Sequence, residues 1–196
     1  MAEPAVLSPP ASTDEILDRA ADAALRLAAE RPWREIALRD IARAAGLSFA
    51  ELYARAPSKA ALMHRLSARL DRQALAQAEE DTADDAEAHD RLFEAVMARL
   101  DAMAPHRDAL IAIARSDGAA AFAPRLPLTA RALLEAAGID TGGPRGALRV
   151  GAMTAVWLRV LQVWRDDEGA LNRTMAEIDK RLRQMRENLK RVGAGY

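Results

Sequence analysis

The sequence predicts an all-α fold with about nine helices. Hydrophobic residues make up 51% of the 196 residues, whereas aromatic residues make up only 4%. Most apolar side chains are therefore Ala, Leu, Val, Ile and Met, which favour helices over strands. Apolar residues recur at helical spacing along most of the chain, and no segment alternates in the manner of a half-buried strand. The length suits one core with a small N-terminal unit beside it.

The first helix is expected at residues 13–30. Ser12 followed by Glu15 matches a capping box, in which each side chain accepts a hydrogen bond from the other residue's backbone N–H. Pro32 ends the helix, because the residue before a proline is disfavoured in the helical conformation. Residues 1–11 contain three prolines and have no helical period, so we expect a frayed tail there.

Two short helices follow, at residues 38–45 and 48–55. Gly46 lies where a left-handed C-terminal cap is needed. Ser48 and Glu51 repeat the capping-box pattern at the start of the second short helix. Two short helices joined in this way fit a helix-turn-helix, in which the first helix braces the second and the second presents its side chains to the major groove of DNA.

The rest of the chain is expected to be helical with short interruptions. Ser58 can cap a longer helix, which ends in the acidic run after Glu79. Prolines, glycines and a polar turn then separate five more helices, expected at 88–103, 105–115, 125–137, 144–165 and 168–190.

Charge is distributed unevenly, although the net charge is only −1. Residues 31–72 hold nine Lys or Arg against four Asp or Glu, whereas residues 79–90 hold seven acidic residues and no Lys or Arg. The basic surplus therefore falls on the helix-turn-helix segment, where it would favour a polyanionic partner.

Several classes of protein are disfavoured by composition. The absence of cysteine excludes disulfides, thiolate metal sites and cysteine nucleophiles. No apolar run reaches the length of a membrane span and no basic signal start precedes one, so the sequence predicts a soluble, cytoplasmic protein. His64, His89 and His106 have no second ligand at metal spacing, so we expect no metal or other cofactor. No set of acid, base and nucleophile is recognisable, so an enzyme is not expected.

The segment from Ile16 to Leu66 resembles the TetR-type bacterial transcriptional repressors. The resemblance lies in the run LRDIARAAGLS, the LY pair of the second short helix and the PSK that opens the next helix. It implies a homodimer that offers two recognition helices to a palindromic operator in double-stranded DNA and is released when a small ligand enters a C-terminal bundle. It also implies three parts: a DNA-binding domain at 12–57, a connecting helix at 58–80, and a ligand-binding and dimerisation domain at 81–196.

The resemblance places the recognition helix at residues 48–55. It implies phosphate contacts by Tyr53 and Lys59, with further backbone or base contacts in the same region. The expected DNA-binding residues are Arg39, Arg43, Ser48, Phe49, Glu51, Tyr53, Arg55 and Lys59.

Three residues of this helix depart from the family pattern, namely Phe49, Glu51 and Ala54. The Glu51 carboxylate has two interpretations. It can be the third residue of a capping box, or it can accept a hydrogen bond from a cytosine amino group.

A small apolar effector is expected to bind between residues 88 and 165. Methionine adapts to irregular shapes, and tryptophan can offer a donor at a pocket edge. The expected lining residues are Phe93, Met97, Met103, Ile111, Phe122, Met153 and Trp157.

The segment 144–190 is expected to form the homodimer interface. Its first helix, at 144–165, is apolar almost all round, and such a helix must be covered on every side. The resemblance agrees, because the last two long helices form the dimer interface in such repressors.

The function predicted is a ligand-responsive transcriptional regulator, in the role of a repressor. The alternative is a lipid- or isoprenoid-binding protein of the same fold that has lost DNA binding. In such a protein Phe49, Glu51 and Ala54 would be ordinary surface residues.

Overall fold

The computed structural model describes residues 12–81, 86–116, 119–167 and 171–196. The frayed tail expected at 1–11 lies outside these residues. The described residues form helices joined by short turns, with no strand among them. The predicted all-α fold is therefore confirmed.

Each of the nine expected helices corresponds to a helix of the structure. The α-helices among the described residues are α1 Thr13–Glu30, α2 Leu38–Ala44, α3 Phe49–Arg55, α4 Lys59–Asp81, α5 Ala88–Met103, α6 Arg107–Arg115, α7 Ala119–Phe122, α8 Leu126–Ala136, α9 Gly143–Asp166 and α10 Asn172–Arg191. Three short 3₁₀ segments accompany them: η1 Trp33–Glu35, η2 Ala104–His106 and η3 Ala123–Arg125.

Two differences from the expected boundaries have local causes. Helix α7 falls in a segment expected to be a break, where three consecutive alanines supply high helix propensity. Helix α10 begins at Asn172 rather than at 168, because Leu171 has a left-handed backbone with φ of 55° and so cannot continue a helix.

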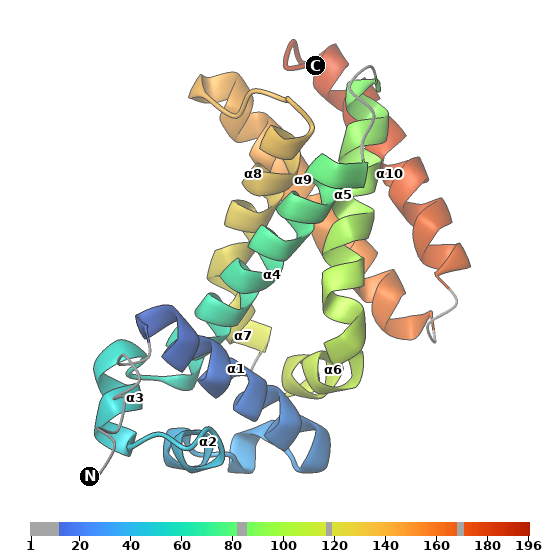
Figure 1. Cartoon of the computed structure of the whole chain (residues 1–196). Coiled ribbons are helices and arrows are strands. Elements are labelled where there is room, and N and C mark those ends of the chain that lie inside the picture. Colours follow the sequence, from blue (N-terminus) through green and yellow to red (C-terminus); the bar gives the residue numbers. More distant parts are fainter. Residues whose placement is uncertain (1–11, 82–85, 117–118, 168–170) are drawn as a thin grey trace, which may run out of the picture.

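Helices α1, α2 and α3 pack against one another at one end of the molecule (Figure 1). The predicted capping box at the start of α1 is present, with Glu15 N–H bonded to Ser12 Oγ at 3.1 Å and Ser12 N–H bonded to a Glu15 carboxylate oxygen at 2.6 Å. Ile41 and Leu52 are fully buried between these helices. The core of this end thus fixes the orientation of the two short helices.

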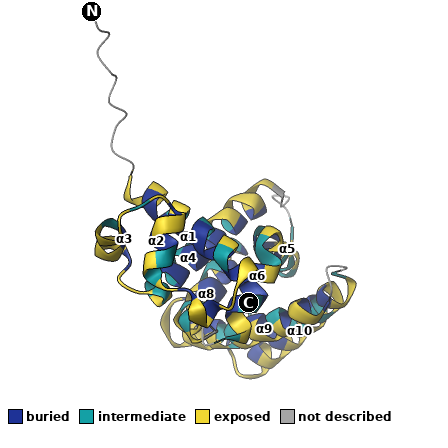
Figure 2. Ribbon diagram, turned by 90° about the horizontal axis from the view of Figure 1, so that it is seen from below, coloured by how far each residue is buried: buried dark blue, intermediate teal, exposed yellow. Residues whose placement is uncertain are grey.

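Helix α4 connects this end to the rest of the molecule (Figure 1). Its N-terminal part packs on α1, and its later turns pack on α5 and α8. Helices α9 and α10 lie against each other, and α8 and α5 cover their inner sides. Figure 2 shows the buried residues gathered between the helices, while α3 is exposed over most of its surface. In the described part of the chain, no helix has the length and apolarity needed to cross a bilayer.

Candidate nucleic-acid interface and ligand cavity

The turn between α2 and α3 depends on Gly46 and on two arginines of α1. Gly46 has φ of +66°, a conformation that glycine adopts without strain. The Arg19 guanidinium donates to the carbonyl of Ala45 at 2.7 Å, and Arg26 donates to that of Ala44 at 3.4 Å. These cations satisfy carbonyl groups that the end of α2 leaves without partners. Helix α1 therefore holds the turn in place.

Helix α3 is anchored from beneath by Leu52, which is fully buried. The Ser48 hydroxyl accepts a hydrogen bond from the Glu51 N–H at 3.1 Å, which is one half of the expected capping box. The Glu51 carboxylate does not return the bond and has no hydrogen-bond partner among the described residues. It therefore stays available at the surface.

The outer face of α2 and α3 carries most of the expected DNA-binding residues. The Arg39 guanidinium lies 5.3 Å from the centre of the Phe49 ring, and the Phe49 and Tyr53 ring centres are 5.7 Å apart. These three residues form one connected surface that joins the two helices. The exposed members of the expected set are Arg39, Arg43, Ser48, Phe49, Tyr53 and Arg55.

Lys59 and Arg55 have contacts within their own unit. The Lys59 ammonium donates to the Trp33 carbonyl at 2.8 Å and lies 4.6 Å from the centre of the Trp33 ring. Arg55 Nη1 donates to the Glu51 carbonyl at 2.9 Å. Lys59 therefore stabilises the fold at the start of α4, whatever else it contacts.

Part of the basic surplus of residues 31–72 is neutralised within the fold. Arg31 pairs with Asp40 at 3.3 Å, Arg65 pairs with Asp14, and Arg69 pairs with Asp22 at 2.7 Å. The Ala37 N–H, and then Arg31, lower the pKa of Asp40 and keep its carboxyl ionised at the start of α2.

Arg39 and Arg43 form no ion pair with any described residue, and both are exposed. The uncompensated positive charge of this end therefore lies on α2, beside α3.

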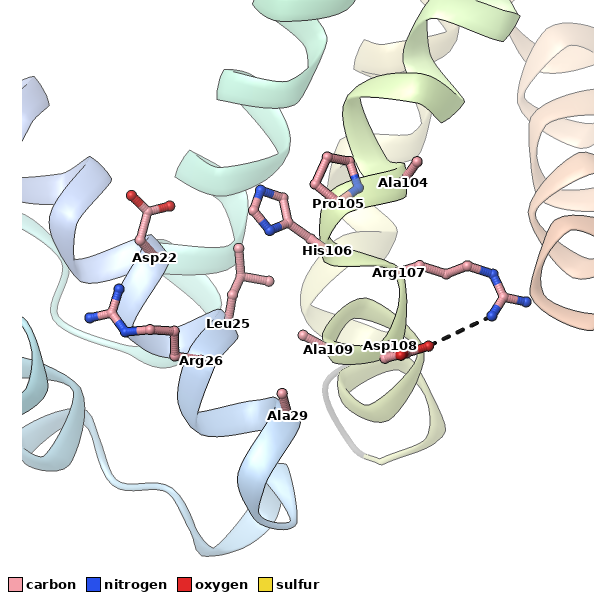
Figure 3. A pocket seen from close by; sticks show the side chains of 10 residues that line it. All are labelled: Asp22, Leu25, Arg26, Ala29, Ala104, Pro105, His106, Arg107, Asp108 and Ala109. Carbon is pink, nitrogen blue, oxygen red and sulfur yellow. Dashed lines mark ion pairs between the residues drawn. The ribbon is translucent and has the colours of Figure 1, made fainter. Parts of the chain in front are cut away.

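A depression of about 600 Å³ lies between α1 and the start of α6 (Figure 3). Asp22, Leu25 and Arg26 of α1 face His106 and Ala109 across it. Burial, and then the positive charge of Arg69, lower the pKa of His106. Short or charged side chains line most of this depression, so it resembles a seam between two parts more than a pocket for an apolar ligand.

A second cavity, of about 320 Å³, lies inside the bundle between α4, α5, α6, α8 and α9. Its walls are mostly apolar, as expected of a ligand pocket. Four of the seven expected lining residues contribute to it: Met103, Ile111, Phe122 and Trp157.

The other three expected residues lie elsewhere. Met153 is fully buried in the core, Phe93 lines a depression beside Met175 of α10, and Met97 does not reach the cavity. Phe93 and Met97 share one side of α5, whereas Met153 is on the same side of α9 as Trp157 but one turn away from the cavity.

The cavity also has a charged floor that sequence reasoning missed. Asp71 of α4 is buried and accepts hydrogen bonds from Arg99 Nε at 2.8 Å, Arg125 Nη2 at 2.7 Å and the Thr129 hydroxyl at 3.0 Å. Arg99, Arg125 and Thr129 line the cavity directly. The one sequence signal was the position of Asp71, which follows the buried Leu70 on the mainly inward side of α4.

One face of α9 is left uncovered. Leu148, Gly151, Ala155 and Leu158 are all exposed and recur on one side of the helix. A groove beside this stripe runs between α9 and α10 and includes Val192, of which 66% is exposed. The apolar character expected of 144–165 thus includes an exposed stripe, of which only Leu158 also lines the bundle cavity.

Comparison with known proteins places the N-terminal segment in a family. Residues 20–66 match the model of the bacterial regulatory proteins of the tetR family. The chain carries a TetR-family N-terminal domain. The matched segment contains α2, the Gly46 turn and α3.

The whole fold is also that of TetR regulators. A TetR transcriptional regulator from Nitrosomonas europaea is 26% identical and has a TM-score of 0.66, over 87% of this chain and 97% of that chain. A TetR transcriptional regulator from Rhodococcus sp. RHA1 is 16% identical with a TM-score of 0.61, over 87% of this chain and 94% of that one. A tetR-family regulator from Streptomyces coelicolor is 18% identical with a TM-score of 0.56, over 90% and 83%. No curated protein matches the chain.

The described residues offer no group of three or more His, Asp or Glu side chains placed to hold a metal ion.

Proposed function

We propose that this chain is a ligand-responsive transcriptional repressor that binds a palindromic DNA site as a homodimer. The observation that carries the proposal is the pairing of an exposed Arg39–Phe49–Tyr53 surface on a TetR helix-turn-helix with a mostly apolar cavity, joined by one continuous helix, α4. The exposed surface supports DNA binding, and the cavity supports control by a small molecule.

On DNA, the exposed side chains of Arg39, Arg43 and Tyr53 would contact phosphates beside the recognition helix. Ser48 and Phe49, at the start of α3, would face base edges, and Phe49 suits a thymine methyl group. The unpartnered Glu51 carboxylate can accept from a cytosine amino group. Phosphate contacts supply affinity, and these base contacts supply specificity.

The apolar stripe on α9 supports the homodimer. A two-fold axis passing beside Leu158 would bring the same stripe from two copies together, so one surface would serve both partners. Such a dimer presents two α3 helices with opposite orientation, which is the symmetry of a palindromic site. The interface we propose therefore spans about residues 144–190, as the sequence predicted.

Two contacts link the cavity to the DNA-binding end. On α4, Asp71 holds the cavity floor, while Arg69 of the same helix donates to Asp22 of α1 at 2.7 Å. On α6, Ile111 lines the cavity, while Ala109 faces α1 across the depression of Figure 3. An effector that shifts α4 or α6 would therefore change the position of α1 and, through Arg19, of the turn between α2 and α3.

Binding to selected DNA tests the proposal. The protein should enrich a palindrome from random fragments, and affinity should fall with salt. Arg39→Ala or Arg43→Ala should weaken binding and reduce the salt slope by about one for each phosphate that is no longer neutralised. Arg72→Ala is the matched control, because Arg72 is exposed on α4 away from the turn. The absence of salt-dependent DNA binding by the unaltered chain would overturn the proposal.

The dimer is tested by mass measurement in solution. Ala155→Glu should produce a monomer that no longer retains the palindrome, because a carboxylate cannot be buried unpaired in an apolar interface. Ala76→Glu is the control, since Ala76 on α4 is likewise an exposed alanine of a helix. A dimer that survives Ala155→Glu would rule out this interface.

A second candidate is a lipid- or isoprenoid-binding protein of the same fold without DNA binding. It is favoured by α3, which exposes Phe49 and Ala54 and carries the acidic Glu51, whose charge repels a polyanion. Solvent extraction of the purified protein should then release a lipid. A selected palindrome with no released lipid would exclude this candidate.

A further inference from the structure

The floor of the bundle cavity has more positive than negative charge. Arg99 and Arg125 both donate to the single carboxylate of Asp71. Among the described residues that line the cavity there is no aspartate or glutamate, whereas Arg165 at its edge already pairs with Asp166. Counted over the described residues, the cluster of Asp71, Arg99 and Arg125 therefore carries one uncompensated positive charge.

Both arginines also have unused donors. Arg99 is only 4% exposed, and its Nη1 is buried without a hydrogen-bond partner among the described residues. Arg125 Nε is likewise buried without a hydrogen-bond partner among the described residues. A buried guanidinium with an unsatisfied N–H is costly, so such groups are normally paired. Burial lowers the pKa of Arg99, and Asp71 opposes that effect.

The remaining walls of the cavity are apolar and partly aromatic. The Arg99 guanidinium lies 5.8 Å from the centre of the Trp157 ring, so the charged and aromatic parts of the site adjoin. Met103, Ile111 and Phe122 provide the apolar surface around them. A ligand that fits both parts needs an acidic group at one end and a hydrophobic body at the other.

We propose that the cavity binds an amphipathic monocarboxylate, with its carboxylate at Arg99 and Arg125 and its hydrophobic body against Trp157 and Phe122. A monoanion is favoured over a dianion such as a phosphate monoester, because one negative charge neutralises the cluster. This inference rests on the proposed effector site and changes the effector expected from the sequence, which was simply apolar. Asp71 is then a competitor for the same two arginines.

Matched pairs of ligands test the inference. Hexanoate, decanoate, benzoate and naphthoate are compared with their methyl esters by calorimetry on the full chain, and by the fluorescence of the tryptophans. The carboxylates should bind at least about tenfold more tightly than their esters, because an ester has no negative charge to accept the charge-assisted hydrogen bonds of the two arginines. Equal binding of the esters, or no binding by any carboxylate of the set, would overturn the inference.

Substitutions at the floor give effects of opposite sign. Arg99→Met should remove the preference for carboxylates. Arg125→Gln should also remove it, and this variant provides the test if Arg99→Met fails to fold. Asp71→Asn should instead tighten carboxylate binding by about tenfold, since it removes the competing charge while keeping a similar shape. Arg72→Met, on the exposed side of α4, should change nothing. A carboxylate preference that survives at Arg125→Gln would show that the floor does not recognise the ligand.

These measurements are made without DNA, so the two proposals can fail separately. A carboxylate that binds in the cavity but leaves DNA binding unchanged would contradict the role as an effector, and this inference would stand. Release of DNA by a neutral ligand, with no preference for carboxylates, would contradict this inference alone.

Discussion

The two ends of the molecule use charge in different ways. In the unit of α1 to α3, arginines lie at the surface and contact backbone carbonyls or an aromatic ring, as Arg19 and Arg39 do. In the bundle, Arg99 and Asp71 are buried against each other. Exposed charges are hydrated and contribute little to stability, whereas a buried pair stabilises only while both partners are present.

This difference between surface and buried charges shows which properties depend on the local sequence and which depend on the whole fold. The partners around α3 lie close in the chain, such as Ser48 and Glu51, which are three positions apart. The partners of Asp71 lie 28, 54 and 58 positions away. The surface of α3 can therefore change without disturbing the fold, while the cavity floor cannot change without disturbing its neighbours.

The largest effect should follow from Asp71→Ala. It leaves Arg99 with a buried charge and no counter-ion, so the free energy of unfolding should fall by about 3–5 kcal/mol. Chemical denaturation measures this change in the free energy of unfolding. Asp101→Ala is the matched control on α5, because Asp101 is exposed and should change stability by about 0.5 kcal/mol or less. A similarly small effect of Asp71→Ala would remove the contrast between the two regions.

The sequence predicted the N-terminal unit well because its signals are local. The capping residue Ser12, the turn residue Gly46 and the buried Leu52 each act within a few positions, and all three were expected. The bracing of α2 by Arg19 was not expected, because Arg19 and Ala45 are 26 positions apart. Only the packing of α1 against the turn brings them together.

In the bundle the sequence identified helices but not which of their residues reach the cavity. Trp157 and Met103 line it, whereas Met153, one turn from Trp157 on α9, packs in the core. Helical periodicity shows which residues share a face, but it does not show which neighbour covers that face. The charged floor was missed for the same reason, since its members come from separate helices.

The next largest effect should follow from Gly46→Ala. An alanine at φ of +66° is strained by roughly 1–2 kcal/mol, and its Cβ would lie 3.2 Å from Arg19 Nη2. Gly193→Ala is the control, because Gly193 has φ of +72° and an alanine Cβ there would meet no atom within 4 Å. Thermal unfolding should show a greater loss for Gly46→Ala. Equal losses of stability would mean that Arg19 does not constrain the turn, and that only the left-handed backbone at residue 46 disfavours an alanine there.

The smallest effect concerns two carboxylates that accept hydrogen bonds from backbone N–H groups near helix starts, one in each region. In the N-terminal unit, the Ala37 N–H lowers the pKa of Asp40. In the bundle, the Thr174 hydroxyl lowers the pKa of Asp167, which also accepts from the Thr174 N–H at 2.8 Å at the start of α10. A carboxyl whose pKa is lower in the folded state stabilises the fold above the unfolded value of about 3.9. That stability is lost as pH falls through the folded pKa.

Asp167→Asn should therefore lower the melting temperature at about pH 7, and its effect should shrink as pH falls and the carboxyl of the unaltered protein becomes protonated. Asp40→Asn should behave in the same way, but it should also change DNA binding, because Asp40 lies at the start of α2 beside Arg39. Asp167→Asn should leave DNA binding unchanged. If both substitutions affected DNA equally, the start of α10 would be coupled to the helix-turn-helix, and the two regions would not be as separate as their charge arrangements indicate.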